Sequence, residues 1–410
     1  MKSITNLFRV GPGPSSSHTI APSCAARAFK RFIKEEGKIV VTLYGSLAFT
    51  GSGHRTQNAI EKALKPFEVE FVLKPLEPTE HPLKMVYDFV GKTQQIHHIY
   101  YSLGGGEISS PTDSEVNETE IYPFKDFESI KKYMYENGIS SFKDLCKRFE
   151  PEDIDDRLME ILKSMFASVE EGIATEGLVP TNDNPKLRYE RCAKQIRENA
   201  ISIPEFEARR EMLITAYAYS VAENSASGID VVTSPTCGSS GVLPGILYFG
   251  YAHMNIPLEV LRDSLYVAGM IGNVVKQNAS IAGSVGGCQA EIGTASSMAA
   301  AALSFIVDPE SIYQMEYAAE CAMEHFLGLS CDPVDGYVVI PCIERNGMGA
   351  LRAYDAFLYA KYISPLRKNQ VSFDDVVSAM KITGDSLSDK YKETAQGGLA
   401  EILKKTNSNC

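Results

Sequence analysis

The sequence predicts an α+β protein, in which an N-terminal mixed α/β domain is followed by a mostly α-helical C-terminal domain. Up to about residue 125, short β-rich apolar stretches alternate with short helical segments. After about residue 190, long apolar helical segments are separated by Gly/Pro-rich loops. A chain of 410 residues is long enough for two or three domains. We therefore expect an N-terminal domain over residues 1–150, a helical connector over 151–185 and a C-terminal domain over 186–410.

The N-terminal domain is expected to contain at least three strands, because β-branched and apolar residues concentrate in three short stretches. These stretches are residues 38–44, 69–73 and 94–102. One helix should begin near Ile20, where the chain becomes rich in alanine, and another should cover residues 57–64. The hydroxyls of residues 15–17 then stand at a helix N-terminus. They either cap that helix or help its N–H groups to bind an anion such as a carboxylate.

The rest of the chain is expected to be helical. Residues 153–174 carry apolar side chains at a 3.6-residue period, as an amphipathic helix requires. An apolar helix should also follow the small-residue loop at 234–241. Further helices are predicted at about residues 205–224, 256–277, 293–307, 310–328, 347–363 and 373–383.

Composition narrows the class of protein. The net charge of -12, without a long basic run, argues against nucleic acid or anionic membranes as partners. Nine scattered cysteines in a chain of this length do not form a disulfide framework. Residues 1–10 lack the apolar core of a signal peptide, and the most apolar stretch, 298–307, is too short to span a bilayer. We therefore expect a cytoplasmic protein.

Three cysteines of the C-terminal half lie beside glycine or proline, where the chain turns. They are Cys288, Cys331 and Cys342. Thiolates on loops can converge on a soft metal centre. No C-x-x-C spacing is present, so the spacing alone leaves both a metal site and ordinary buried thiols open.

Five separated motifs carry a resemblance that covers nearly the whole chain. They are residues 13–19 (GPSSSHT), 44–54 (YGSLAFTGSGH), 286–289 (GGCQ), 330–334 (SCDPV) and 341–346 (PCIERN). In this order they resemble the iron–sulfur-dependent L-serine dehydratases, also called L-serine ammonia-lyases. The resemblance is to the single-chain form, in which a β-type domain precedes an α-type domain that carries the cluster and ends in a cysteine tail.

This resemblance implies a lyase that converts L-serine to pyruvate and ammonia with a [4Fe–4S] cluster and without pyridoxal phosphate. The cluster would be held by Cys288, Cys331 and Cys342, which leaves one iron free to act as a Lewis acid. Cys410 would occupy that iron at rest. His54 is expected to be the base and His18 its orienting partner. Substrate contacts are expected from Ser15, Ser16, Ser17, Thr19 and Asn278, and the family implies a homodimer.

Three departures from the family pattern lie near these motifs. Val285 stands where an acidic residue is common, Gln57 replaces an Asp, and Cys237 replaces Asn or Ala. They leave two alternatives open: elimination on L-threonine or L-cysteine, and a non-catalytic, cluster-containing amino-acid sensor. A pyridoxal phosphate enzyme is disfavoured because the chain has no recognisable Ser/Lys segment for a Schiff base.

Overall fold

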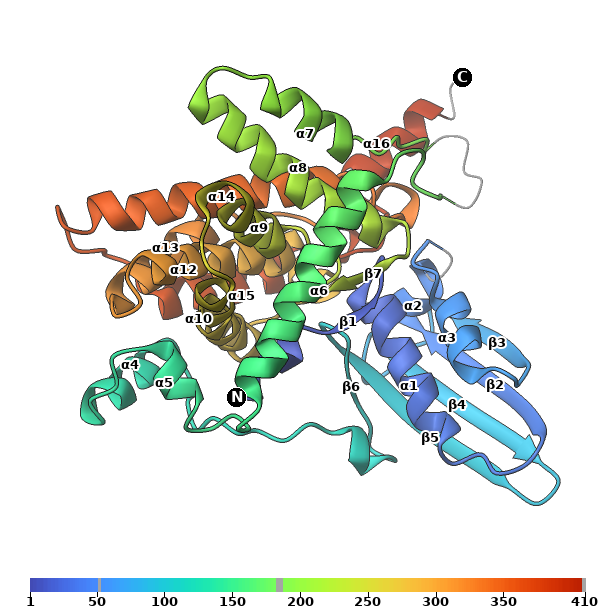
Figure 1. Ribbon diagram of the computed structural model, residues 1–410. Helices are drawn as coiled ribbons and strands as arrows, with labels where there is room; N and C mark the ends of the chain where they lie inside the picture. The colour runs from blue at the N-terminus through green and yellow to red at the C-terminus, as the bar shows by residue number, and fades with distance from the viewer. Residues whose placement is uncertain (51–52, 182–186, 408–410) are drawn as a thin grey trace.

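The computed structural model describes residues 1–50, 53–181 and 187–407. A small sheet with helices packed on it lies beside a larger helical body (Figure 1). The long helix α6 (Ile154–Ala174) runs along the helical body near its boundary with the sheet. This arrangement confirms the predicted α+β class.

The sheet has five strands in the order β3-β2-β4-β5-β6. Strands β2 and β3 are parallel, and the remaining neighbours are antiparallel. Apolar side chains from helices α1 and α3, among them Phe29 and Ile60, form a core with residues such as Val41 and Tyr87. The sheet unit consists of α1 (Ala21–Lys30), β2 (Gly37–Tyr44), α2 (Gly45–Thr50), α3 (Thr56–Leu64), β3 (Val69–Lys74), β4 (Lys84–Gly91), β5 (Gln95–Gly104) and β6 (Glu107–Ser109).

The helical body forms a second, larger core. Its centre is α12, whose alanines at 299–302 are fully buried and allow α10, α13 and α14 to pack closely around it. Its helices are α4 (Phe127–Glu136), α5 (Phe142–Cys146), α6, α7 (Ala193–Ile201), α8 (Phe206–Ala226), α9 (Val242–Met254), α10 (Leu258–Asn278), α11 (Gly283–Gly286), α12 (Thr294–Val307), α13 (Ile312–Glu324), α14 (Cys342–Ile363), α15 (Phe373–Ser386) and α16 (Gly398–Asn407).

The helical run Gln289–Val307 is long and apolar enough to cross a membrane, the single such run found among the described residues. Within the fold, however, 83% of its most apolar window is buried against other helices. This burial is typical of a core helix, and the run forms the centre of the helical body.

The first twelve residues belong to the helical body and not to the sheet unit. Ile4 and Leu7 are fully buried against helix α10, where a Cβ at Gly269 would lie only 2.6 Å from Ile4 Cβ. Strand β1 (Val10–Pro12) then pairs antiparallel with β7 (Asp230–Val232). The chain therefore crosses from one body to the other at residues 13–15, which sets the following loop at their junction.

The chain returns to the helical body after the sheet. Tyr122 and Phe124 already lie in its core, followed by the buried faces of α4 and α5. Residues 1–150 thus contribute side chains to both cores. The division at residues 150 and 185 stays a prediction.

Candidate active site

His18 lies on a π-helical turn, Ser16–Ile20, that leads directly into helix α1. Ser15 caps this turn, and its side chain accepts a hydrogen bond from the His18 N–H at 3.2 Å. Hydroxyl groups hold the imidazole at both nitrogens: Ser17 Oγ lies 2.8 Å from Nδ1, and Ser46 Oγ lies 2.9 Å from Nε2. Burial, with a further contribution from His54, lowers the pKa of His18 well below its usual value. This imidazole is therefore neutral at neutral pH and fixed in orientation.

His54 lies against His18, with 4.5 Å between the ring centroids. Its backbone carbonyl accepts a hydrogen bond from Thr19 Oγ1 at 2.7 Å. The next residue, Arg55, donates to the carbonyl of Ser227 in the helical body at 2.8 Å. Burial lowers the pKa of His54 to about 4. The sheet unit and the helical body thus both fix the segment that carries this second neutral imidazole.

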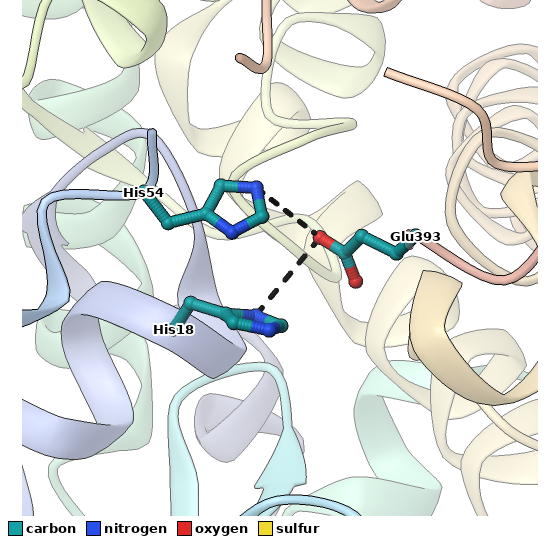
Figure 2. A group of neighbouring side chains, drawn as sticks. All are labelled: His18, His54 and Glu393. Atoms are coloured by element: carbon teal, nitrogen blue, oxygen red, sulfur yellow. Dashed lines mark ion pairs between the residues drawn. The ribbon is translucent and has the colours of Figure 1, made fainter. Parts of the chain in front are cut away.

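Glu393 completes a group with the two histidines, as Figure 2 shows. One carboxylate oxygen lies 3.7 Å from His54 Nε2 and 4.0 Å from His18 Nδ1. Burial, then the nearby Glu291 and Cys288, raise the pKa of this carboxyl well above its usual value. We call these three residues the imidazole–carboxylate group. The group brings together two side chains from residues 18–54 and one from the C-terminal region of the chain.

The three cysteines singled out in the sequence are all buried. Cys288 Sγ, Cys331 Sγ and a carboxylate oxygen of Glu291 lie within 4.8 Å of one another. Cys342, at the start of α14, interacts electrostatically with Cys288. We call Cys288, Cys331 and Cys342 the cysteine group. A Cβ at Gly283 would lie 3.2 Å from Cys331 Sγ, so the glycine keeps room beside the sulfur.

Arg345, beside the cysteine group, favours a thiolate at Cys288. A hydrogen bond from Cys331, supported by Arg345, lowers the pKa of Cys288. The pKa of Cys331 is raised, chiefly by its hydrogen bond with Cys288, and burial raises that of Cys342. A guanidinium beside converging buried sulfurs offsets thiolate charge, and sulfur is the ligand of soft metals. These residues therefore fit a thiolate-bound iron–sulfur cluster.

Glu393 connects the two groups through the backbone. Its N–H donates to the carbonyl of Cys331 at 2.8 Å, and the N–H of Cys331 donates to the carbonyl of Tyr391 at 2.8 Å. Glu393 adopts a φ of 60°, a left-handed conformation that is uncommon for residues other than glycine. The loop before α16 therefore holds this carboxylate between the cysteines and the imidazoles.

Three further residues were predicted to belong to the site: Ser16, Asn278 and Cys410. Ser16 is buried on the π-helical turn. Asn278, the last residue of α10, donates from Nδ2 to the carbonyl of Lys125 at 2.9 Å. Cys410 lies outside the described residues.

The three departures from the family pattern also differ in their positions. Val285 is exposed on α11, and Gln57 is partly buried on α3. Cys237 is buried, and burial, then Glu291, raise the pKa of its thiol. Cys237 is thus the fully buried one of the three, and it interacts with Glu291 beside the cysteine group.

Sequence reasoning missed four side chains at this site: Ser46, Glu291, Arg345 and Glu393. Glu291 and Arg345 each follow a cysteine by three residues, a spacing that returns a side chain to the same side of a helical turn, so this signal was available. Thr236 Oγ1 donates to Glu291 at 2.7 Å, and burial raises the pKa of this carboxyl to about 7. Glu393 gave no such local signal.

Two family models match this chain, one after the other. The model described as "Serine dehydratase beta chain" matches residues 3–74, and "Serine dehydratase alpha chain" matches residues 83–400. The chain is also similar to curated proteins named L-serine dehydratase. The protein of Streptomyces coelicolor is 36% identical over 97% of this chain and 98% of its own length. That of Helicobacter pylori is 34% identical over 98% and 99%, and "L-serine dehydratase 2" of Escherichia coli is 33% identical over 98% of both.

Matches of this extent, on a fold in which Glu393 connects two histidines of the first region to a cysteine of the second, lead to one conclusion. The chain belongs to the serine dehydratase family, with the beta-chain and alpha-chain regions of that family joined in one polypeptide.

Proposed function

We propose that this protein is an L-serine ammonia-lyase, which removes water from L-serine and releases pyruvate and ammonia. The observation that carries the proposal is the juxtaposition of the imidazole–carboxylate group with the cysteine group through Glu393 and Cys331. Relatives named L-serine dehydratase, which this chain matches over nearly their whole length, support the choice of substrate. Serine must lose a weakly acidic α-proton and a poor leaving group, so a base and an electrophile are needed at one site.

The cofactor in this proposal is a [4Fe–4S] cluster held by Cys288, Cys331 and Cys342, without pyridoxal phosphate. The converging buried sulfurs beside Arg345 support it. When bound, such a cluster supplies a Lewis-acidic iron that withdraws electrons from the carboxylate and hydroxyl of a substrate. Cys410 remains our proposed resting ligand.

His54 is the proposed base and His18 the residue that positions it. His18 already has a hydroxyl group at each ring nitrogen, which suits a fixed supporting role. His54 is unprotonated at neutral pH because burial lowers its pKa to about 4, so it can accept the α-proton. Its Nε2 points toward Glu393 (Figure 2).

The predicted hydroxyl contacts divide into two kinds in this proposal. Ser15, Ser17 and Thr19 form hydrogen bonds to the backbone or ring of the two histidines, so their first task is to hold the imidazoles. Ser16 and Asn278 remain proposed substrate contacts. The wider proposal is a cytoplasmic homodimer that acts on a small amino acid.

Removal of individual cysteines tests the function and the cofactor together. Protein reconstituted with iron and sulfide without oxygen should form pyruvate from L-serine. Cys331→Ala and Cys342→Ala should lose both iron and activity, since each removes a thiolate ligand. Cys24→Ala, a partly exposed thiol in the sheet unit, is the matched control and should retain both.

Two results would contradict the proposal. One is cluster-loaded protein that forms no product from L-serine, with L-threonine and L-cysteine tested alongside. The other is a Cys331→Ala variant that keeps wild-type iron content and turnover. Serine binding without turnover would instead favour the sensor alternative.

A further inference from the structure

We propose that Glu393 recognises the α-ammonium group of the substrate and thereby restricts this site to amino acids. The inference rests on the proposed function, because it names the part of the same substrate that this carboxylate would bind. It gives Glu393 a role that is separate from holding metal and from accepting the α-proton.

Glu393 is a buried acid whose ion-pair partners in the described part of the chain are the two neutral imidazoles. The residue is 6% exposed, and the backbone N–H of Ser284 is a hydrogen-bond donor to its carboxylate. Among the described residues, no lysine or arginine forms an ion pair with it. Arg345 instead pairs with Asp332 and donates to the carbonyl of Ser330 at 2.7 Å. A carboxylate buried in this way is costly unless a cation joins it, and an ammonium group is a suitable cation.

The position of Glu393 relative to the base fits the covalent structure of an amino acid. The ammonium nitrogen and the α-proton are attached to the same carbon atom. The group that binds the ammonium must therefore lie within a few ångströms of the base that takes the proton. Glu393 Oε1 lies 3.7 Å from His54 Nε2, on the side to which that nitrogen points (Figure 2).

The other buried acid of the site is less suited to this task. The carboxylate of Glu291 accepts a hydrogen bond from Thr236 and lies beside the sulfurs of Cys288 and Cys331. Among the residues that the structure describes, Glu291 has no hydrogen bond or ion pair with His18 or His54. An ammonium held by Glu291 would therefore be close to the cysteine group, whereas one held by Glu393 would be close to the base.

The backbone at Glu393 also favours a role in binding. The residue is held at a φ of 60° while its N–H is bonded to the carbonyl of Cys331. Left-handed backbone at a glutamate is unfavourable and persists where the surroundings enforce it, commonly at functional sites. The same conformation keeps the carboxylate between the cysteine group and the imidazoles, where a substrate bridging the two would place its α-carbon.

The test compares substrates with and without the amine in Glu393→Gln. Glutamine keeps the volume and a hydrogen-bond acceptor but removes the charge. The KM for L-serine should rise roughly 10- to 100-fold, as for the loss of a charge-assisted hydrogen bond. The inhibition constant of 3-hydroxypropionate, which has the carboxylate and hydroxyl but no amine, should change less than about threefold. Glu393→Asp, which keeps the charge, should restore part of the preference for L-serine.

Iron and sulfide content, together with the absorption spectrum of the cluster, should match those of the wild type. Glu310→Gln, an exposed glutamate ahead of α13, is the control for a charge removed elsewhere. If Glu393→Gln loses iron, the comparison is made on Glu393→Asp, where L-serine should again be weakened more than 3-hydroxypropionate.

An equal loss of affinity for both compounds would overturn the inference, and so would an unchanged KM for L-serine. These outcomes differ from failure of the proposed function. In that case the cluster-loaded wild-type protein would itself form no pyruvate from L-serine.

Discussion

At the scale of single residues, the most unusual feature is a pair of fully buried histidines in ring contact. Burial disfavours the charged form of each, and His54 adds repulsion to a protonated His18. Both therefore remain neutral in the folded protein under conditions where exposed histidines begin to take up protons. This difference couples folding to pH.

The coupling predicts that stability falls as the solution becomes acidic. His54 has an ordinary pKa of 6.5 when unfolded and about 4 when folded, so between these values only the unfolded state binds the proton. The stability that His54 contributes is full above pH 6.5 and is lost as the pH falls toward 4. As the pH falls from 7.5 to 5, protonation of His54 in the unfolded state should lower the free energy of unfolding by roughly 2 kcal/mol.

Urea unfolding of wild type and His54→Gln at the two pH values measures this difference. The glutamine variant should lose roughly 2 kcal/mol less than the wild type, because its side chain takes up no proton. Asn58→Ala, at an exposed position of α3, removes no titratable group; it is the control and should follow the wild type. Identical pH dependence of wild type and His54→Gln would show that His54 is not buried as a neutral group.

At the scale of elements, two π-helical turns aim the functional side chains. Ser16–Ile20 leads into α1 and carries His18, while Gln289–Gly293 leads into α12 and follows Cys288 directly. A π-helical turn adds a residue to the helical repeat and so rotates the neighbouring side chains. The sequence predicted both helices to within about a residue of their starts, but apolar periodicity carries no signal for a wider turn.

Strand β4 was not predicted from the sequence, because the local pattern of its residues is weak. Residues 84–91 contain Asp88 and end in glycine, which interrupts the apolar pattern that marks its neighbours. Tertiary pairing with β2 and β5 on either side stabilises it nonetheless. Strands recognised from their own composition, such as β2 and β3, are confirmed in place.

The crossing of α6 and α8 gives a prediction at this scale. A Cβ added at Gly172 would lie 2.3 Å from the carbonyl oxygen of Ser220, which is closer than atoms can approach. Gly172→Ala should therefore destabilise the protein by about 1–3 kcal/mol through overpacking, although alanine is the better helix former. Denaturant unfolding followed by circular dichroism measures the change.

Ser164→Ala, at a partly exposed position of the same helix, is the matched control and should change stability by less than about 0.5 kcal/mol. A Gly172→Ala variant as stable as the wild type would mean that α6 and α8 can separate without loss of packing.

At the scale of the whole molecule, the family resemblance in the sequence indicated both halves of the site but not the residue that connects them. The motifs around His18, His54 and the three cysteines were visible because each is local. Glu393 was not, since its place between them depends on a loop that returns from the far end of the chain to Cys331. Contacts between residues so distant in sequence follow from the packing of the two bodies, which no local pattern encodes.

The sheet itself joins the two regions recognised by the family models. Strands β2 and β3 fall in the first region, whereas β4, β5 and β6 fall in the second. Backbone pairing between β2 and β4, from Gly37 opposite Gly91 to Leu43 opposite Met85, crosses from one to the other. The stretch between β3 and β4 is a surface connection, with Leu76 83% exposed.

A break in that connection should leave the fold intact. Fragments 1–77 and 78–410, produced in the same cell, should associate through β2–β4, β1–β7 and the burial of Ile4 and Leu7 in the helical body. Co-purification by a tag on one fragment, followed by the anaerobic pyruvate assay, measures the outcome. Fragment 78–410 alone should lack activity, since it has neither His18 nor His54. A fully active lone fragment would refute this.

The interleaved sheet therefore makes a covalent link between β3 and β4 dispensable in principle. A gene for this enzyme could undergo fission there and encode two subunits, because each product would carry strands that only the other can complete.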